Sequence, residues 1–316
     1  MAHAQALRPV PFYHAYLLDL MQTILVPLDF SPAAENALLY ANKLAVRLPA
    51  ELVLVHSTAG EALTPELRAA QLARLGALAE RLRYQQLTRQ DGRRISYHFH
   101  LAPEPLADCL EVLVAGYRAD LVVTGFPLTD CAAATAAGSP LTLLPERVSC
   151  PVLLVPPGRH ELPGHLVISG DFARLGGAQL APLAALARTP AAHFDLVQFH
   201  APGSTGLVSL KKALLAARAH LPGAAAHLLA EEDALEGLSE FCARRQAQLI
   251  VLATADGCLV RRFFNPLYQR TDAYHLRVPA LLLPTSTLPT KACCARCALR
   301  QSAEMPLMAR RESVAF

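Results

Sequence analysis

The chain has 316 residues, of which 53% are hydrophobic, and a formal net charge of +3. This length allows two domains of ordinary size. No apolar stretch reaches the roughly 18 residues of a membrane span, and the 29 Lys and Arg residues are scattered rather than gathered on one helix face. Composition therefore predicts a soluble, cytoplasmic protein and argues against a membrane-spanning or nucleic-acid-binding one.

The first expected elements follow an N-terminal extension. Residues 1–20 contain no continuous apolar core of the kind that a signal peptide needs, so we expect them to be unstructured. The apolar run 24–28 predicts a buried strand, and apolar residues at helical spacing over 37–48 predict a helix behind it. Ser31 is the expected N-cap of that helix, and Pro32 is its expected first residue.

The rest of the first half alternates between apolar strands and segments of helical period. Strands are expected at 52–56, 95–101, 121–124 and 152–155, and helices at 65–87, at 106–117 and after Ser139. Strands that are apolar on both faces and separated by helices are typical of a parallel sheet with βαβ crossovers. The first half is therefore predicted to be a doubly wound, five-stranded α/β domain.

The second half repeats the first in the same order. The runs 24–29 and 166–171 both end in Asp and are both followed by Phe, and three later apolar runs also match. Helices are expected at 211–220, 234–245 and about 266–275. We therefore predict two tandem, Rossmann-like, five-stranded parallel-sheet domains. Their expected bounds are 21–157 and 165–285, with a turn-rich linker between them and a flexible, cysteine-containing tail over 286–316.

One loop of the first half suggests a phosphate site. Gly125 ends the fourth expected strand, Leu128 follows it, and nine residues later come Gly138 and Ser139. Glycines let backbone amides approach phosphate oxygens, and a helix capped by Ser139 would favour an anion at its N-terminus. Ligands of doubly wound sheets bind beyond the carboxyl ends of the strands, where the strand order reverses. If the first and fourth strands are neighbours there, Asp29 and Gly125 lie across one crevice.

Together these features resemble the universal stress protein family. The matching elements are Val26–Ser31, His56 at the end of the second strand, the loop from 125 to 139, and Cys150–Pro156. The resemblance spans about residues 21–284 and so includes both halves. It implies an adenine-nucleotide α-hydrolase-like fold and a role in stress response or signalling.

The resemblance also implies a ligand, which is ATP or AMP with Mg²⁺, bound by the first domain. Asp29 would contact the ribose, and Gly138 with Ser139 would hold the phosphates. Around the adenine and along the loop, the same resemblance places Pro27, Leu28, Ser57, Gly125 and Leu128. No catalytic residue and no protein metal site are implied.

Leu128 departs from the family pattern, because nucleotide-binding members have a glycine at that position. A leucine brings a Cβ and a branched side chain where a phosphate needs bare backbone, and Pro127 removes a donor. The loop from 125 to 139 also contains no Lys or Arg. The alternative is therefore a scaffold or partner-binding protein of the same fold that binds no nucleotide.

An enzyme is not expected. The chain has no Walker Gly-x-x-x-x-Gly-Lys, no Gly-x-Gly-x-x-Gly turn and no Ser-Gly-Gly-x-Asp-Ser pyrophosphate loop after its first strand. Neither an activated nucleophile nor a pair of carboxylates replaces these motifs.

The second half has lost the loop, since Ala253, Asp256 and Pro266 stand at the glycine positions. It is therefore expected to be degenerate and to serve in pairing. The family resemblance implies that the two halves associate through edge strands, here 152–155 against 281–283. A homodimer and an unidentified protein partner are further alternatives.

Several polar residues have two interpretations. Asp29 is either a ribose contact or a turn residue at the end of a strand. His56 is either a ligand contact or a hydrogen-bonded core histidine. His98 and His100 share one strand face, so they are either metal ligands or surface histidines. The cysteines at 293–297 are either the start of a soft-metal site or part of a basic tail.

Overall fold

The fold is taken from a computed structural model. It describes residues 23–58, 60, 62–88, 94–125, 148–173, 175, 180, 183, 193–221, 223–253 and 277–283. The expected N-terminal extension, the cysteine-containing tail, and the expected helices after Ser139 and at 266–275 lie outside these residues.

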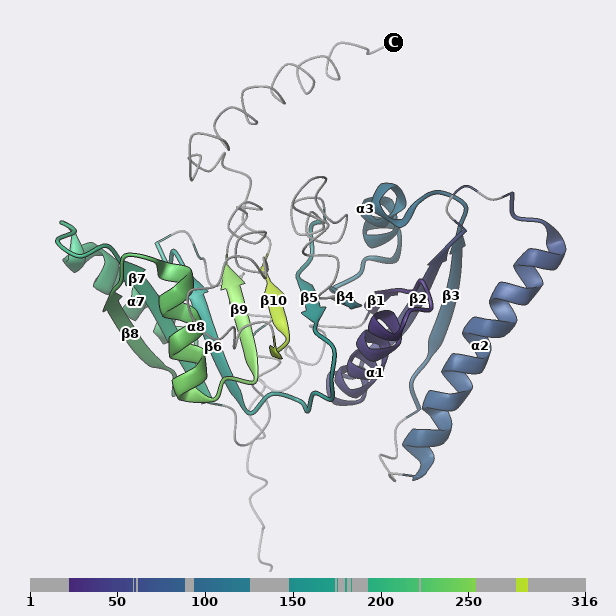
Figure 1. Ribbon diagram of the computed structural model, residues 1–316, viewed down its shortest axis with the longest axis horizontal. Coiled ribbons are helices and arrows are strands. Elements are labelled where there is room, and N and C mark those ends of the chain that lie inside the picture. Colours follow the sequence, from purple (N-terminus) through teal and green to yellow (C-terminus); the bar gives the residue numbers. More distant parts are fainter. Residues whose placement is uncertain are drawn as a thin grey trace, which may run out of the picture.

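The described strands form one ten-stranded sheet, made of two halves with corresponding strand orders (Figure 1). The first half has the order β3-β2-β1-β4-β5, and the second continues as β10-β9-β6-β7-β8. The strands of the first half are β1 (Thr23–Pro27), β2 (Glu51–Ser57), β3 (Tyr97–Ala102), β4 (Leu121–Gly125) and β5 (Val152–Val155). Those of the second half are β6 (His165–Gly170), β7 (His193–His200), β8 (Ala225–Ala230), β9 (Leu249–Ala253) and β10 (Ala280–Leu282). The predicted α/β fold class, five strands twice over, is confirmed.

Within each half all strand pairs are parallel, and the halves meet through one antiparallel pair. In that pair, Leu281 of β10 lies opposite Leu153 of β5, and Ala280 lies opposite Leu154. All residues of both strands are buried. The apolar edge of each half is thereby covered by the other.

The described helices of eight or more residues cover both faces of this sheet. They are α1 (Pro32–Arg47), α2 (Pro65–Thr88), α3 (Leu106–Tyr117), α7 (Leu207–Ala219) and α8 (Ala234–Arg245). Side chains of α1, α2 and α7 share one core with one sheet face, and those of α3 and α8 share a second core with the other face. None of the helices in the described ranges combines the length and apolarity needed to span a membrane.

Local sequence signals explain where most helices begin. The Ser31 hydroxyl accepts a hydrogen bond from the backbone N–H of Ala34 at 3.2 Å, and Pro32 opens α1 as predicted. In contrast, α7 begins at Leu207 rather than at the predicted Lys211. Gly206 precedes it with φ 86°, a left-handed conformation that glycine adopts without strain. The expected strand 95–101 is likewise displaced to Tyr97–Ala102.

Candidate functional site

The strand order reverses between β1 and β4, which makes their carboxyl ends the expected ligand position. β1 pairs in parallel with β2 on one side and with β4 on the other. Ile24 lies opposite Leu121, and Leu25 lies opposite Val122. Asp29, two residues after β1, and Gly125, the last residue of β4, therefore lie at the same end of neighbouring strands.

Asp29 forms a tight turn between β1 and α1. Its Oδ1 accepts a hydrogen bond from the backbone N–H of Ser31 at 2.8 Å, while the side chain as a whole remains exposed. Asp171 makes the same bond in the second half, where its Oδ1 accepts from the N–H of Ala173 at 3.1 Å. The turn thus accounts for an aspartate in both halves, and exposure leaves the carboxylate of Asp29 accessible from solvent.

The residues expected to surround adenine differ in how far they are exposed to solvent. Pro27 and Leu28 are buried. The Leu28 N–H donates to the carbonyl of Val55 at 2.7 Å, and its carbonyl lies 2.7 Å from Nδ1 of His56. Ser57 is half-buried, and its hydroxyl donates to the carbonyl of Glu104 at 2.6 Å. The N–H and the carbonyl of Leu28 therefore both have partners within the protein. The partner of the carbonyl is the ring of His56.

Gly125 has a packing explanation that needs no ligand. A Cβ at this position would lie 2.4 Å from the carbonyl oxygen of Ala33, in the first turn of α1. Only glycine allows β4 and α1 to approach this closely. The other loop residues expected to hold phosphates, namely Leu128, Gly138 and Ser139, lie outside the described residues.

A cation that the sequence did not indicate lies beside this end of the sheet. The exposed Arg74 of α2 places its guanidinium carbon 3.7 Å from the ring centroid of Phe30, the residue after Asp29. The ring of His56 lies 4.5 Å from the same Phe30 ring. Phe30 has φ 61°, an uncommon conformation for a residue with a side chain. Arg74 is 44 residues from Phe30 in the chain, and no local pattern relates the two.

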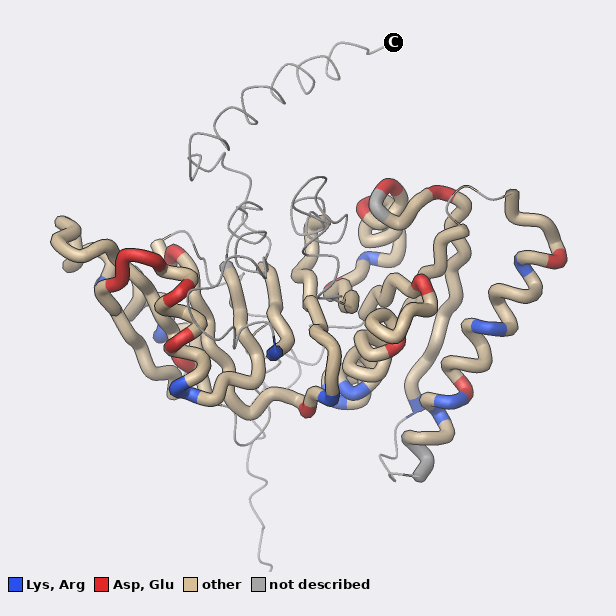
Figure 2. The backbone as a smooth tube through the Cα atoms, in the orientation of Figure 1, with Lys and Arg blue, Asp and Glu red and all other residues tan. Residues whose placement is uncertain are grey.

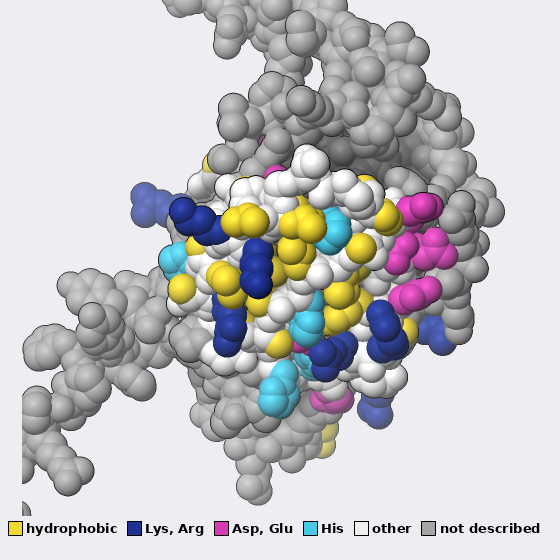
Figure 3. Space-filling view, turned by 90° about the vertical axis from the view of Figure 1, so that its left-hand side faces the viewer, with side chains coloured by type: hydrophobic (Ala, Val, Ile, Leu, Met, Phe, Trp, Pro, Cys, Tyr) yellow, Lys and Arg dark blue, Asp and Glu magenta, His cyan; other side chains and the backbone are white. Residues whose placement is uncertain are grey.

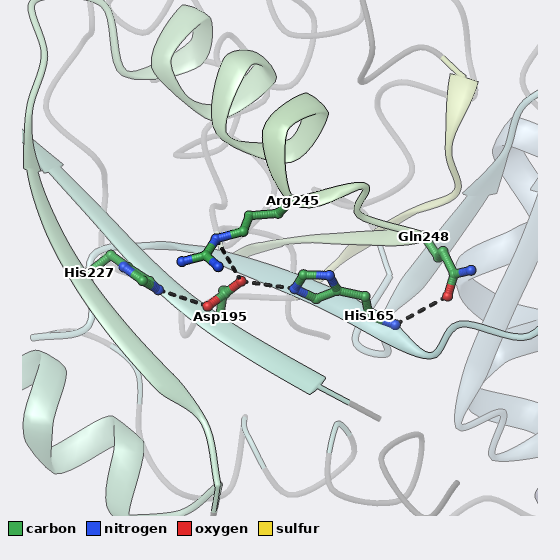
Figure 4. Close-up of polar contacts among 5 residues, drawn as sticks. All are labelled: His165, Asp195, His227, Arg245 and Gln248. Carbon is green, nitrogen blue, oxygen red and sulfur yellow. Dashed lines mark hydrogen bonds and ion pairs between the residues drawn. The ribbon is translucent and has the colours of Figure 1, made fainter. Parts of the chain in front are cut away.

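A second polar cluster lies in the other half and was also missed (Figure 4). Asp195 of β7 is buried, with 7% of its side chain exposed. Its Oδ2 lies 2.8 Å from Nε2 of His165, and its Oδ1 lies 2.7 Å from Nε2 of His227. Arg245, at the end of α8, brings its Nε to 3.7 Å from Oδ2. One carboxylate thus joins three neighbouring strands and a helix.

Electrostatics favours the ionised form of this carboxylate. Burial alone would raise the pKa of Asp195. The hydrogen bonds from His165 and His227 and the charges of His227 and Arg245 outweigh burial, so the pKa lies below its usual value. Beside this cluster, the amide oxygen of Gln248 accepts from the backbone N–H groups of Gly164 and His165, at 2.6 and 3.2 Å.

The position of this cluster indicates a structural role. His165 begins β6, and Asp195 and His227 lie in the amino-terminal halves of β7 and β8, at the end of the sheet opposite to the expected ligand position. Each Nε2 is directed at an oxygen of Asp195 rather than at a shared point (Figure 4). Across the described ranges, no group of three or more His, Cys, Asp or Glu side chains could hold a metal ion.

The remaining candidates have ordinary partners. His98 lies 3.1 Å from a carboxylate oxygen of Glu51, and His100 lies 3.0 Å from the hydroxyl of Tyr117. Burial raises the pKa of the Cys150 thiol to about 12, which keeps it protonated and unreactive. The cysteines at 293–297 lie outside the described residues.

Strand order and crossovers define a doubly wound α/β protein, and comparison with known proteins agrees. A universal stress protein from Archaeoglobus fulgidus has a similar fold, with a TM-score of 0.59 at 12% identity, covering 85% of this chain and 98% of that one. A functionally unknown protein from Pseudomonas aeruginosa has a TM-score of 0.55 at 16% identity, covering 85% and 94%. Both similarities extend over both halves of the sheet.

A sequence comparison also matches the first half of the chain. Residues 21–156 match the model of the universal stress protein family. The first half of the chain is therefore similar to universal stress proteins in sequence as well as in fold. Comparison with curated proteins finds no match.

Proposed function

We propose that this protein is a stress-responsive binding protein, without enzymatic activity of its own, that holds an adenine nucleotide at the carboxyl ends of β1 and β4. The observation that carries the proposal is the pairing of an exposed acid with an exposed cation at the point where the strand order reverses. Arg74 stacks on Phe30, which directly follows Asp29 in the chain. ATP or AMP, with Mg²⁺ at the phosphates, fits this combination.

The chemistry assigns a different part of the ligand to each residue. A carboxylate such as that of Asp29 accepts hydrogen bonds from ribose hydroxyls. A guanidinium such as that of Arg74 forms charge-assisted hydrogen bonds to phosphate oxygens. Arg74 would supply the positive charge that the sequence between 125 and 139 lacks. Its stacking on Phe30 restricts the side chain before any ligand arrives, which lowers the entropic cost of binding.

The first test is whether the purified full chain carries a nucleotide. Denaturation followed by mass spectrometry should release ATP or AMP, and calorimetric titration of the stripped protein should show binding that depends on Mg²⁺. Absence of released nucleotide, together with no heat on addition of ATP or AMP, would contradict the proposal.

The second test separates the residues. Asp29→Ala and Arg74→Ala should each weaken ATP binding about tenfold, the effect of losing about 1.4 kcal/mol. Arg81→Ala is the matched control, because Arg81 lies two turns further along α2 and pairs with Glu35 at 2.7 Å. Leu128→Gly should strengthen binding if the loop is otherwise competent. Equal losses in Arg74→Ala and Arg81→Ala would mean that general positive charge, not this site, attracts the nucleotide.

One observation favours the alternative of a partner-binding scaffold. Gly125 is fully accounted for by its contact with Ala33, so this glycine does not by itself indicate a ligand. If nucleotide binding fails both tests, the same end of the sheet becomes the surface on which to look for a protein partner.

A further inference from the structure

The two outer edges of the ten-stranded sheet are protected to different degrees. At the β3 edge, α2 packs alongside the strand, with Arg83 over the ring of Tyr97 at 5.0 Å. At the other edge, β8 pairs with β7 alone among the described strands. The sequence of β8 is Ala-Ala-His-Leu-Leu-Ala, which contains none of the Lys, Glu or Pro residues that usually protect an edge.

The backbone of β8 presents hydrogen-bonding groups outward. The N–H of Glu231, directly after β8, donates to the carbonyl of His200 in β7 at 2.9 Å. Alternate residues of a strand direct their backbone groups to opposite edges. The N–H and C=O groups of Ala226, Leu228 and Ala230 therefore face away from β7. A strand is the partner that satisfies such a row of donors and acceptors.

The charges around this edge indicate which strand would pair with β8. The helix α8, which packs on the neighbouring strand β7, is preceded by Glu231, Glu232 and Asp233. It carries Glu236 and Glu240 and ends with Arg244 and Arg245. Figure 2 shows acidic residues before α8 and along it, and basic residues at its last turn. In Figure 3, which views the molecule from this side, apolar side chains run across the face and acidic ones gather along one margin. A surface with an acidic and a basic pole is complementary to its own copy turned by 180°.

We infer that two copies of this chain pair through β8, antiparallel, about a two-fold axis perpendicular to the sheet. Leu228 would lie opposite Leu228 of the second copy, and Ala226 opposite Ala230, so that the outward N–H and C=O groups meet in hydrogen-bonded pairs. The two α8 helices would then run antiparallel on the same face, with the acidic end of each beside the basic end of the other. The sheet continues from one copy into the next.

Repulsion between like charges opposes this arrangement. The same rotation brings the two α7 helices together on the other face, and α7 carries the exposed Lys211, Lys212 and Arg218 with no acidic residue in the helix. Exposed like charges repel weakly and are screened by salt. The backbone pairs and the α8 contacts must outweigh this repulsion, so the dimer is expected to be moderate in affinity.

The experiment measures the mass of the full chain by sedimentation velocity over a range of concentrations. The wild-type protein should move from monomer to dimer with a dissociation constant in the micromolar range, about −8 kcal/mol. Ala230→Pro removes an outward N–H at an exposed position and should leave a folded monomer. Ala225→Pro is the matched control, since its N–H faces β7, so it should lower the melting temperature while leaving the edge able to pair.

A charge exchange tests the orientation. Glu232→Arg and Arg244→Glu should each weaken the dimer about tenfold, and the double variant should recover most of the loss, because both residues are exposed and meet across the axis. A wild-type protein that remains monomeric at high concentration overturns the inference. So does an Ala230→Pro variant that still dimerises, which would point to another surface.

Discussion

The two halves of the sheet have corresponding strand orders but differ in the end at which their main polar cluster lies. In the first half, Asp29 and Arg74 are exposed beside the carboxyl ends of the strands. In the second half, Asp195 is buried near the amino ends and is fully engaged by His165 and His227. Exposed polar groups can exchange water for a ligand, whereas buried and paired groups stabilise the fold. The first half is therefore the one that we propose to bind a ligand, and the second is expected to support the fold.

The amino ends of the two halves show how this division is built. In the first half, the Asp120 carboxylate accepts from the N–H of Thr23 at 3.1 Å, and in the second the Gln248 amide accepts from the N–H of His165 at 3.2 Å. This contact, between the start of one strand and the residue before another, is common to both. By strand register, Asp195 occupies the place of the buried Val53. The second half thus has a carboxylate where the first has an apolar core residue.

The largest expected effect is that of Asp195→Ala, which should lower the free energy of unfolding by about 3 kcal/mol. The substitution leaves two histidines and part of Arg245 without the carboxylate that they surround. Urea denaturation at neutral pH measures it, with Asp29→Ala as the control from the first half. Because Asp29 is exposed and makes a single turn bond, its loss should cost less than about 1 kcal/mol. If the two variants lost the same free energy of unfolding, the carboxylate of the second half would be no more important for stability than that of the first.

The next largest effect concerns the packing of β4 on α1. Gly125→Ala should destabilise the protein by about 2 kcal/mol, because the new Cβ would overlap the carbonyl of Ala33 and force the helix away. Gly76→Ala, in the interior of α2 with nothing within 4 Å of the added Cβ, should instead stabilise by about 0.5–1 kcal/mol. Thermal unfolding of both variants gives the comparison. If Gly125→Ala left the stability unchanged, packing would not explain this glycine, and ligand binding would again be its expected role.

Sequence alone predicted the parts of the molecule that follow from local pattern. The apolar runs and the Ser31 cap each depend on a few consecutive residues. The order of strands and helices follows from these local patterns, so the doubly wound fold could be inferred. The stack of Arg74 on Phe30 and the contacts of Asp195 could not. Each joins side chains from separate elements, and their proximity depends on strand register and helix placement. The packing of Gly125 on Ala33 was missed for the same reason.

A smaller effect is expected in acid. Asp195 has a pKa below its usual value in the folded protein, so its contribution to stability is complete above the unfolded pKa of about 4. That contribution is lost as the pH falls through the folded pKa. Between pH 5 and pH 2, wild-type protein should lose more stability than Asp195→Asn, which has no such proton to take up. Parallel pH profiles for the two proteins would show that the carboxylate of Asp195 is not held ionised by its neighbours.

The smallest effect tests the start of the first helix, where the halves differ by one residue. The turn Asp29-Phe30-Ser31 corresponds to Asp171-Phe172-Ala173, and both aspartates make the same bond to the residue two positions on. Only the first half has a hydroxyl at the third position, and it accepts from the N–H of Ala34. Ser31→Ala gives the first half the residue of the second and should cost about 0.5–1 kcal/mol of stability.

The matched control for the helix cap is Ser209→Ala in α7. The hydroxyl of Ser209 donates to the carbonyl of Gly206 and caps no N–H group, so its loss should change stability by less than about 0.5 kcal/mol. Since Asp29 keeps its bond to the N–H of residue 31 in Ser31→Ala, nucleotide affinity should not change. A variant that lost binding together with helix stability would show that the cap also holds Asp29 in place, which would make the start of α1 part of the binding site.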